Sequence, residues 1–249
     1  MECIHSSYGT CQEEIYVASS FDDVQFYYCL TCGYWSVKMD HKLDAYHEDF
    51  TKHTRSIAEY RALLKTFEPQ SNLVPMDLLE IEIKENPSIL YKISPRKMED
   101  LIAQVFKAYF HCEVIHCGKS HDGGIDLMIV DSDNPILVQV KRRENPNIVE
   151  PVNLIRELLG AMYIKSSKRG IFVSTAKKFS IESKKIRNEL LETKKLDYFE
   201  LIDFNRFCDI LLLTSKKITK PWNDIFLHYL NTDRKELIHK SEYFNHYFP

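Results

Sequence analysis

The feature that most restricts the fold is a series of short apolar segments in the middle of the chain, separated by stretches with helical spacing. Strands are predicted at 113–116, 125–131, 136–141, 170–174 and 199–203, and helices at 149–166 and 181–193. A further helix is predicted to begin at Pro95, with Ser94 as its N-cap. The order helix, three strands, helix, strand, helix, strand predicts an α/β fold in which helices pack on a mixed sheet.

Four polar side chains are expected to meet at one end of this sheet. Asp126 begins one predicted strand, and Gln139 and Lys141 lie near the end of the next. Because side chains alternate along a strand, Gln139 and Lys141 share a face. Glu99 lies one turn into the helix that begins at Pro95, and we expect it to approach the same point.

This set has the chemistry that phosphodiester hydrolysis needs. A hard divalent cation such as Mg²⁺ prefers oxygen ligands and usually takes only one or two carboxylates. The cation lowers the pKa of a water, and Lys141 beside it can hold or deprotonate that water or stabilise charge on the phosphate. Gly123 and Gly124 remove side chains just before Asp126, which leaves room for a nucleic-acid backbone.

Each of these residues also has an ordinary structural interpretation. Asp126 can end a turn, Gln139 and Lys141 can face solvent, and Glu99 can be a first-turn acid that suits the helix dipole. Their joint occurrence beside apolar strand residues favours a catalytic site.

Charge is unevenly distributed along the chain. The net charge is −3, but residues 141–195 hold fourteen Lys and Arg against six Glu and no Asp. Such a concentration is typical of a surface that follows phosphates, although single basic pairs also occur on solvated helix faces. The expected DNA contacts are the glycine turn and two basic pairs, namely Asp122, Gly123, Gly124, Arg142, Arg143, Lys177 and Lys178.

An ordered set of motifs runs through this part of the chain. The motifs are Asn86-Pro87, Ser94-Pro95-Arg96, Glu99, the Asp122 to Asp126 turn, Gln139-Val140-Lys141, Leu158-Leu159-Gly160, Gly170 to Thr175 and Phe179-Ser180. In order and spacing this set resembles the Mrr-like restriction endonucleases of the PD-(D/E)xK superfamily, over roughly 95 of the 249 residues.

The resemblance implies a restriction-endonuclease-like core with the order αβββαβ and a DNA endonuclease that uses Mg²⁺ or Mn²⁺. It implies that Glu99, Asp126 and Gln139 surround the metal and that Lys141 is the catalytic lysine. Many relatives have Glu where this chain has Gln139. An amide oxygen can still ligate a cation, but it contributes no negative charge, so weaker metal binding is expected. The resemblance also implies a role in restriction or anti-phage defence.

The N-terminal segment is expected to form a separate zinc-ribbon-like β unit. Alternating apolar and aromatic positions predict a hairpin within residues 1–42. Cys29 and Cys32 have the Cys-x-x-Cys-Gly form of a zinc knuckle, and Cys3 and Cys11 would complete a structural Zn²⁺ site, with His5 as a substitute for either. A redox pair and buried free thiols are the alternatives.

Four regions are predicted along the chain. They are the zinc-ribbon-like segment at 1–42, a helical linker at 43–85, the nuclease domain at 86–213 and a C-terminal helical extension at 214–249. The linker prediction depends on the helical spacing of apolar residues between Asp40 and Phe67.

The remaining expectations concern location and partners. No run of 18 apolar residues is present, and acidic residues interrupt the first thirty positions, so we expect no membrane span or signal peptide and a cytoplasmic protein. DNA is the expected partner. Two cuts in a duplex favour a homo-oligomer, and a second protein of a defence system is a further expected partner. The alternative function is a non-cleaving or partner-activated nucleic-acid-binding subunit.

Overall fold

The computed structural model describes residues 12–18, 22–29, 34–47, 50–64, 67–72, 74–117, 124–131, 134–214 and 238–247. The chain divides into two compact units. One contains Met1–Glu82 together with Lys217–Pro249, and the other contains Ile83–Lys216. The sequence predicts a nuclease domain at 86–213, and the second unit spans Ile83–Lys216.

The second unit alternates helices and strands. Its helices are η2 (Pro87–Tyr91, a 3₁₀ helix), α2 (Pro95–Phe110), α3 (Val152–Ile164), α4 (Ile181–Glu192) and α5 (Phe204–Leu213). Its strands are β5 (Glu113–His116), β6 (Leu127–Val130), β7 (Ile136–Lys141), β8 (Val149–Glu150), β9 (Arg169–Ser174), β10 (Lys178–Phe179) and β11 (Tyr198–Ile202). Helix α1 (Met76–Glu85) crosses the division between the units.

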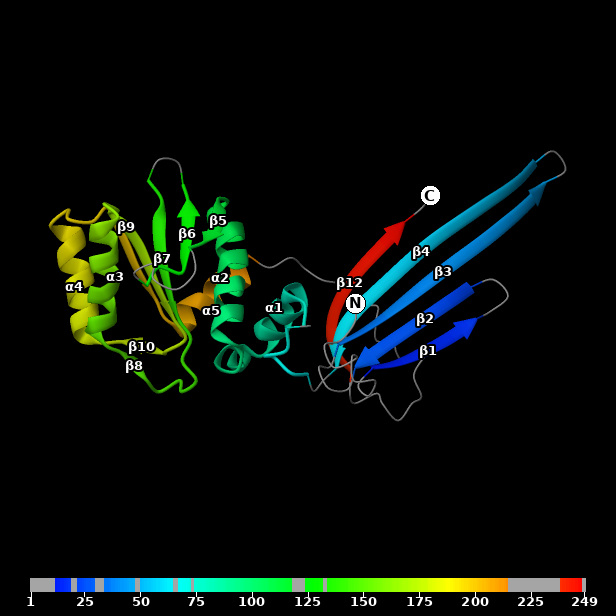
Figure 1. Ribbon diagram of the computed structural model, residues 1–249, viewed down its shortest axis with the longest axis horizontal. Coiled ribbons are helices and arrows are strands. Elements are labelled where there is room, and N and C mark those ends of the chain that lie inside the picture. The colour runs from blue at the N-terminus through cyan, green and yellow to red at the C-terminus, as the bar shows by residue number, and fades with distance from the viewer. Residues whose placement is uncertain are drawn as a thin grey trace. The chain divides into compact units, whose positions relative to one another are not determined.

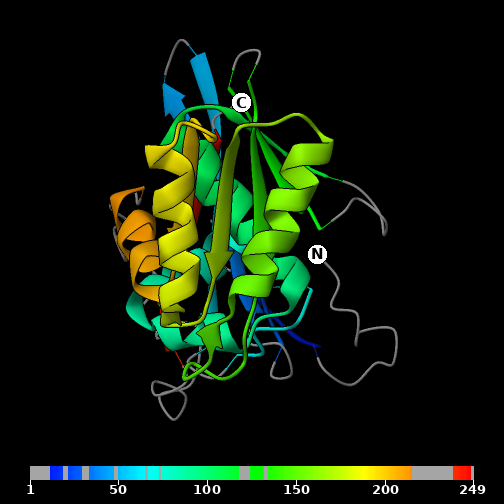
Figure 2. The same ribbon diagram turned by 90° about the vertical axis from the view of Figure 1, so that its left-hand side faces the viewer.

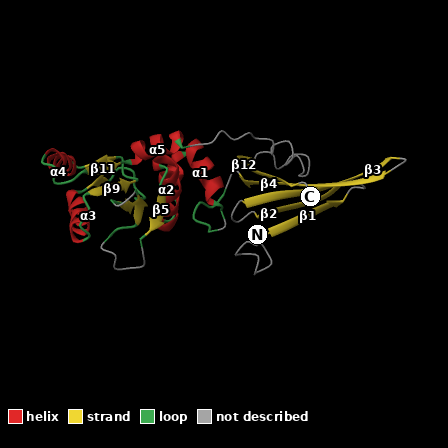
Figure 3. Ribbon diagram, turned by 90° about the horizontal axis from the view of Figure 1, so that it is seen from above, coloured by secondary structure: helices red, strands yellow, loops and turns green. Residues whose placement is uncertain are grey.

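The unit is built on a five-stranded mixed sheet in the order β11-β9-β7-β6-β5. Strands β11, β9 and β7 run parallel, whereas β7, β6 and β5 are antiparallel. Helices α2 and α5 cover one face of the sheet, and α3 and α4 cover the other (Figures 1 and 3). Figure 2 looks onto the α3–α4 face. A separate two-stranded parallel ladder joins β8 to β10. The unit therefore has the predicted α/β architecture, with a mixed sheet between helices.

Helix α2 begins where the sequence predicts. The Ser94 side chain accepts a hydrogen bond from Lys97 N (3.2 Å), and Pro95 occupies the first helical position. The inner face of the helix buries five apolar side chains, Met98, Leu101, Ile102, Val105 and Phe106. Burial of this stripe fixes the rotation of the helix and so determines which way its polar residues point.

The opposite face of the sheet packs against α3. Leu158 and Met162 of α3 contact a buried cluster that includes Leu137, Phe172 and Phe199 of three neighbouring strands. The helix lies close to β9, because a Cβ on Gly170 would stand 2.5 Å from Met162 Sδ. A side chain at that position would require the end of the Met162 side chain to move.

The other unit contains a five-stranded antiparallel sheet. Its strands are β1 (Gln12–Ala18), β2 (Asp22–Cys29), β3 (Tyr34–His47), β4 (Phe50–Leu64) and β12 (Ile238–Tyr247), in the order β1-β2-β3-β4-β12. The helix predicted from Asp40 to Phe67, and with it a wholly helical linker at 43–85, is therefore wrong. The segment pairs as strands instead, with Tyr60 the register partner of Val37 and Ala62 the register partner of Trp35.

The C-terminal prediction is wrong where the structure describes the chain. Residues 238–247 form strand β12, which pairs antiparallel with β4, instead of a helix. Of the predicted zinc ligands, Cys3, Cys11 and Cys32 lie outside the described residues, as does His5, and Cys29 is described only as the last backbone position of β2. Among the described residues, no helix is long and apolar enough to cross a membrane.

Candidate active site

The Asp126 carboxylate is directed by an irregularity in the sheet. Asp126 N donates to Val138 O (2.9 Å), although Leu127 is the register partner of Val138. Two consecutive residues thus face one residue of β7, as in a β-bulge, which changes the direction of a side chain. The Asp126 carboxylate accepts a hydrogen bond from Val140 N at 2.7 Å. Burial raises the pKa of Asp126, while this hydrogen bond and the charge of Lys141 act in the opposite direction.

Gln139 and Lys141 lie on β7 beside this carboxylate. Lys141, the last residue of the strand, is partly exposed, whereas Gln139 is only 2% exposed. Among the described residues, Gln139 Oε1 has no hydrogen-bond partner. A Cβ on Gly124 would stand 3.0 Å from Gln139 Nε2, and the Gly124 φ of 83° also favours glycine. The turn before Asp126 therefore leaves space for the Gln139 amide, whose oxygen is buried without a hydrogen bond.

Glu99, on α2, is the fourth candidate site residue. Burial raises its pKa, and the nearby charge of Asp126 raises it further. Arg96 opposes this effect through an ion pair with Glu99 at 3.2 Å. The two carboxylates are thus close enough to repel each other.

A divalent cation fits this arrangement. It would relieve the repulsion between Glu99 and Asp126 and would give the unpaired Gln139 oxygen a partner. The described residues contain no cluster of three or more His, Cys, Asp or Glu that could hold a metal. The candidate ligands are the carboxylates of Glu99 and Asp126 and the amide of Gln139.

A neighbouring polar cluster was not predicted from the sequence. His116 Nε2 lies 3.2 Å from Asp100 Oδ1, and Arg96 Nε lies 3.4 Å from the same oxygen. Burial lowers the pKa of His116, and Arg96 lowers it further. Asp100 follows Glu99 directly, and this adjacency was the one available signal. Arg96 thus contacts both acids at the start of α2.

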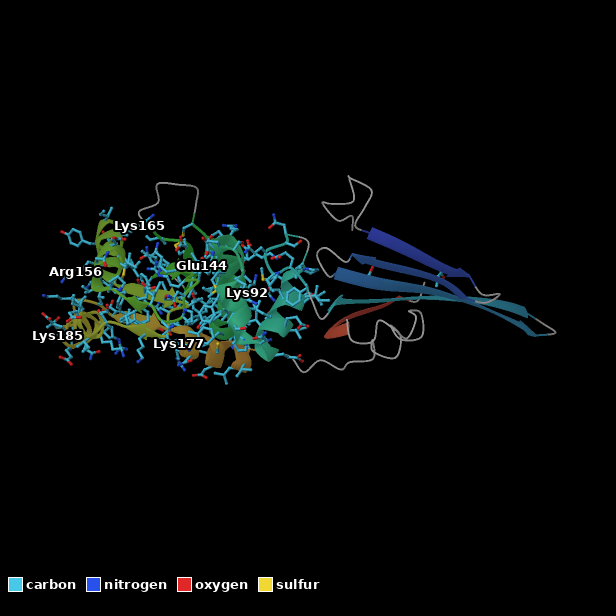
Figure 4. The ribbon with its side chains drawn as sticks, turned by 90° about the horizontal axis from the view of Figure 1, so that it is seen from below. Lys92, Glu144, Arg156, Lys165, Lys177 and Lys185 are labelled. Carbon is cyan, nitrogen blue, oxygen red and sulfur yellow. The ribbon has the colours of Figure 1, made fainter. Side chains whose placement is uncertain are left out.

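The predicted DNA contacts fall into three groups. Asp122 and Gly123 lie outside the described residues, and Gly124 is exposed. The side chains of Arg142 and Arg143 make hydrogen bonds to the protein. Lys177 and Lys178 are exposed (Figure 4 labels Lys177) and line a pocket of about 230 Å³ with Pro146, Asn147, Ile148 and Val149.

Most of the second unit matches a known family in sequence. Residues 90–211 match the family model Mrr_cat, described as a restriction endonuclease. The second unit contains an Mrr-type restriction-endonuclease domain. All four candidate catalytic residues lie within the matched range of this endonuclease domain.

The solved structure of the restriction endonuclease FokI is similar at a TM-score of 0.37 and 16% identity, over 66% of this chain and 30% of that chain. The chain thus spans less than a third of that enzyme's length. A search of curated proteins gave no significant match.

Replacing Gln139 by glutamate should strengthen cation binding to the endonuclease domain. The substitution adds a third carboxylate, and the affinity of such sites rises with ligand charge. We expect the Mg²⁺ concentration that gives half-maximal thermal stabilisation to fall about tenfold, a difference of about 1.4 kcal/mol. In EDTA the variant should melt below the wild type, because the added charge is buried without a partner. Gln104→Glu, on an exposed position of α2, is the matched control. An unchanged Mg²⁺ dependence in Gln139→Glu would remove Gln139 from the ligand set.

Proposed function

We propose that this chain is a divalent-cation-dependent DNA endonuclease that hydrolyses phosphodiester bonds in restriction or anti-phage defence. The observation that carries the proposal is the meeting of Glu99, Asp126 and Lys141 next to the buried, unpaired Gln139 oxygen. The family match of residues 90–211 supports a nuclease domain around it.

Glu99, Asp126 and Gln139 would hold Mg²⁺ or Mn²⁺. When bound, such a cation supplies charge neutralisation at the scissile phosphate and activation of a water. The residues of the chain orient the reaction around it. The hydrogen bond from Val140 N fixes the Asp126 carboxylate, and burial keeps Gln139 in place.

Lys141, the last residue of β7, would act as the catalytic lysine. Its ammonium group is suited to hold a water next to the phosphate or to stabilise charge that develops on the phosphate oxygens. Lys177 and Lys178 would contact the backbone of the same DNA, together with Asp122, Gly123 and Gly124. Neither lysine takes part in an ion pair with another described residue.

Cleavage of DNA by the purified protein is the direct test. Supercoiled plasmid and phage DNA are incubated with Mg²⁺ or Mn²⁺, beside the Asp126→Ala protein. We expect nicked and linear products from the wild type and none from the variant. Equal cleavage by both proteins would point to a contaminating nuclease or to another site, and the assignment of Asp126 would fail.

A second function is favoured by one observation. Gln139 brings no charge to the site, and Arg96 forms an ion pair with Glu99 at 3.2 Å, so we expect the free protein to bind a cation less tightly than a site with three carboxylates. A subunit that binds nucleic acid without cutting, or that cuts only with a partner protein, is consistent with this weakness. DNA binding without cleavage at millimolar Mn²⁺ would favour this function.

The remaining proposals concern assembly and location. We infer a homo-oligomer, because two cuts in a duplex need two active sites, and a cytoplasmic location with its DNA substrate. A structural Zn²⁺ held by Cys3, Cys11, Cys29 and Cys32 is proposed from the cysteine spacing. Metal analysis of the purified chain tests the zinc site.

A further inference from the structure

The turn that follows the proposed catalytic lysine carries two arginines whose side chains are held by the protein. Arg143 Nε and Nη2 donate to the two carboxylate oxygens of Glu150, at 2.6 and 2.9 Å. Arg142 Nη1 donates to Tyr91 O at 3.3 Å and lies 3.1 Å from Glu144 Oε1. The Arg142 side chain is only 12% exposed. Two of the five N–H donors of the Arg143 side chain are thus bound to the buried Glu150.

Glu150 is the centre of this network. It is fully buried, and its Oε1 also accepts a hydrogen bond from Ser174 Oγ at 2.7 Å. Ser174 is the register partner of Lys141 across β7 and β9. A buried carboxylate persists only when its charge is paired and its oxygens are hydrogen-bonded, and Arg143 and Ser174 meet both conditions. Glu150 therefore joins the loop after Lys141 to the strand beside it.

Thr175 holds the backbone of the same turn. Thr175 N donates to Lys141 O at 3.1 Å. Its hydroxyl accepts from Arg143 N at 2.6 Å and donates to Arg143 O at 3.1 Å. The backbone is therefore fixed at Lys141 itself and two residues beyond it.

Arg142 extends the network to the other side of the site. Tyr91, whose carbonyl it contacts, is the last residue of η2 and lies shortly before α2, which carries Glu99. The segments that carry Lys141 and Glu99 are thus connected by a hydrogen bond as well as by packing.

We propose that Arg143, Glu150 and Ser174 act as a clasp that positions Lys141, and that Arg143 does not serve as a contact to the DNA backbone. This inference rests on the proposed nuclease function of Lys141. The lysine amine is attached to the backbone through a flexible four-carbon stem, so movement of the backbone is added to the movement of the stem itself. A displacement of about 1 Å in a reacting group can cost about a hundredfold in rate.

The two roles of Arg143 predict different effects of salt. Loss of a phosphate contact reduces the slope of log Kd against log salt concentration by about one. Loss of a positioning residue leaves that slope unchanged and alters Lys141 instead. The variants are Arg143→Gln, which removes the charge, and Ser174→Ala, which keeps Arg143 and removes one hydrogen bond of the clasp. Lys165, exposed at the end of α3, provides the control Lys165→Gln.

Two measurements on the full chain decide between these roles. Binding to a fluorescent duplex is measured in EDTA across a salt series. The reactivity of the Lys141 amine towards acetic anhydride is measured by peptide mass spectrometry, with Lys165 of the same sample as internal reference. We expect both variants to keep the wild-type slope and to show a several-fold rise in Lys141 reactivity. Where the wild type cleaves DNA, the rate for Arg143→Gln at saturating DNA should fall about 10- to 100-fold.

A slope reduced by about one in Arg143→Gln, or an unchanged Lys141 reactivity in the folded variants, would overturn the clasp. If Arg143→Gln does not fold, the Lys141 reactivity of Ser174→Ala decides the question alone. A wild type that cleaves no DNA would contradict the proposed function, whereas salt dependence and lysine reactivity would still test the clasp.

Discussion

Replacing Lys141 by alanine should reduce DNA cleavage by at least about 10²- to 10³-fold, the loss typical when a charge-stabilising group is removed from a reaction centre. Lys141 ends β7 beside the Asp126 carboxylate, and no other lysine in the described residues acts on the pKa of that group. The fold should survive, because the side chain is partly exposed and the strand is held by its backbone. Single-turnover cleavage of supercoiled plasmid, together with a thermal melt, measures both quantities.

Lys141→Arg separates two roles of this side chain. Arginine keeps the positive charge but does not release its proton near neutral pH. If the amine stabilises charge, the arginine variant should retain part of the activity, and if the amine must accept a proton, activity should be lost as in the alanine variant. Lys165→Ala serves as the control and should cleave like the wild type. Wild-type cleavage by Lys141→Ala would exclude Lys141 from the reaction.

Asp126→Asn should abolish cleavage and also the stabilisation of the protein by Mg²⁺. The carboxamide can still accept the hydrogen bond from Val140 N, so the local fold is kept, but one of two carboxylate ligands is lost. Ligand binding to the folded state raises the melting temperature, so Mg²⁺ should raise that of the wild type and leave that of the variant unchanged. Differential scanning fluorimetry in EDTA and in Mg²⁺ measures this difference.

The pH dependence of this stability has a defined sign. The pKa values of Asp126 and Glu99 are both raised in the folded protein, first by burial. Ionisation of either group therefore costs the folded state free energy, and the metal-free protein should lose stability as the pH rises through the raised values. In EDTA at neutral pH, Asp126→Asn should accordingly melt at or above the wild type. A lower melting temperature for the variant at every pH would contradict the burial of an uncompensated charge at Asp126.

The sheet of the endonuclease domain was predictable because its strands carry strong local signals. Residues 113–116 and 136–141 form β5 and β7 with the predicted bounds, since apolar and β-branched residues there are bordered by turn residues. Helix α5 was not predicted. The helix follows β11 directly. Its N-cap, Asp203, is the last residue of the strand that the sequence predicts at 199–203.

In the N-terminal unit, the spacing of apolar residues predicts the wrong secondary structure. The apolar residues from Asp40 to Phe67 fit a helical spacing, yet Leu43 faces Thr54 and Val37 faces Tyr60 across β3 and β4. Spacing along one segment carries no information about a partner strand, and pairing with a neighbour can override helical propensity. The same reason explains why β12 was missed, since its partner β4 lies far away in the sequence.

The sequence predicts candidate site residues but not the contacts that support them. Alternation along β7 placed Gln139 and Lys141 on one face, and the N-cap at Ser94 placed Glu99. The sequence could not show that Arg143 is neutralised by Glu150, because a charge pattern does not distinguish a buried acid from a solvated one. The bulge at Asp126 depends on pairing with β7 and has no local signal.

The residues that support Lys141 come late in the order of synthesis. Ser174 and Thr175 follow Lys141 by more than thirty residues, which a ribosome adds in roughly two to seven seconds. A nascent chain that ends near Lys141 already carries Glu99, Asp126 and Gln139 but has no β9 against which β7 can pair. The parallel β7–β9 pair forms only after α3 has crossed over the sheet. Under the proposed function, incomplete chains should therefore be inert towards the DNA of the cell that makes them, because the proposed site is completed only once β9 has been made.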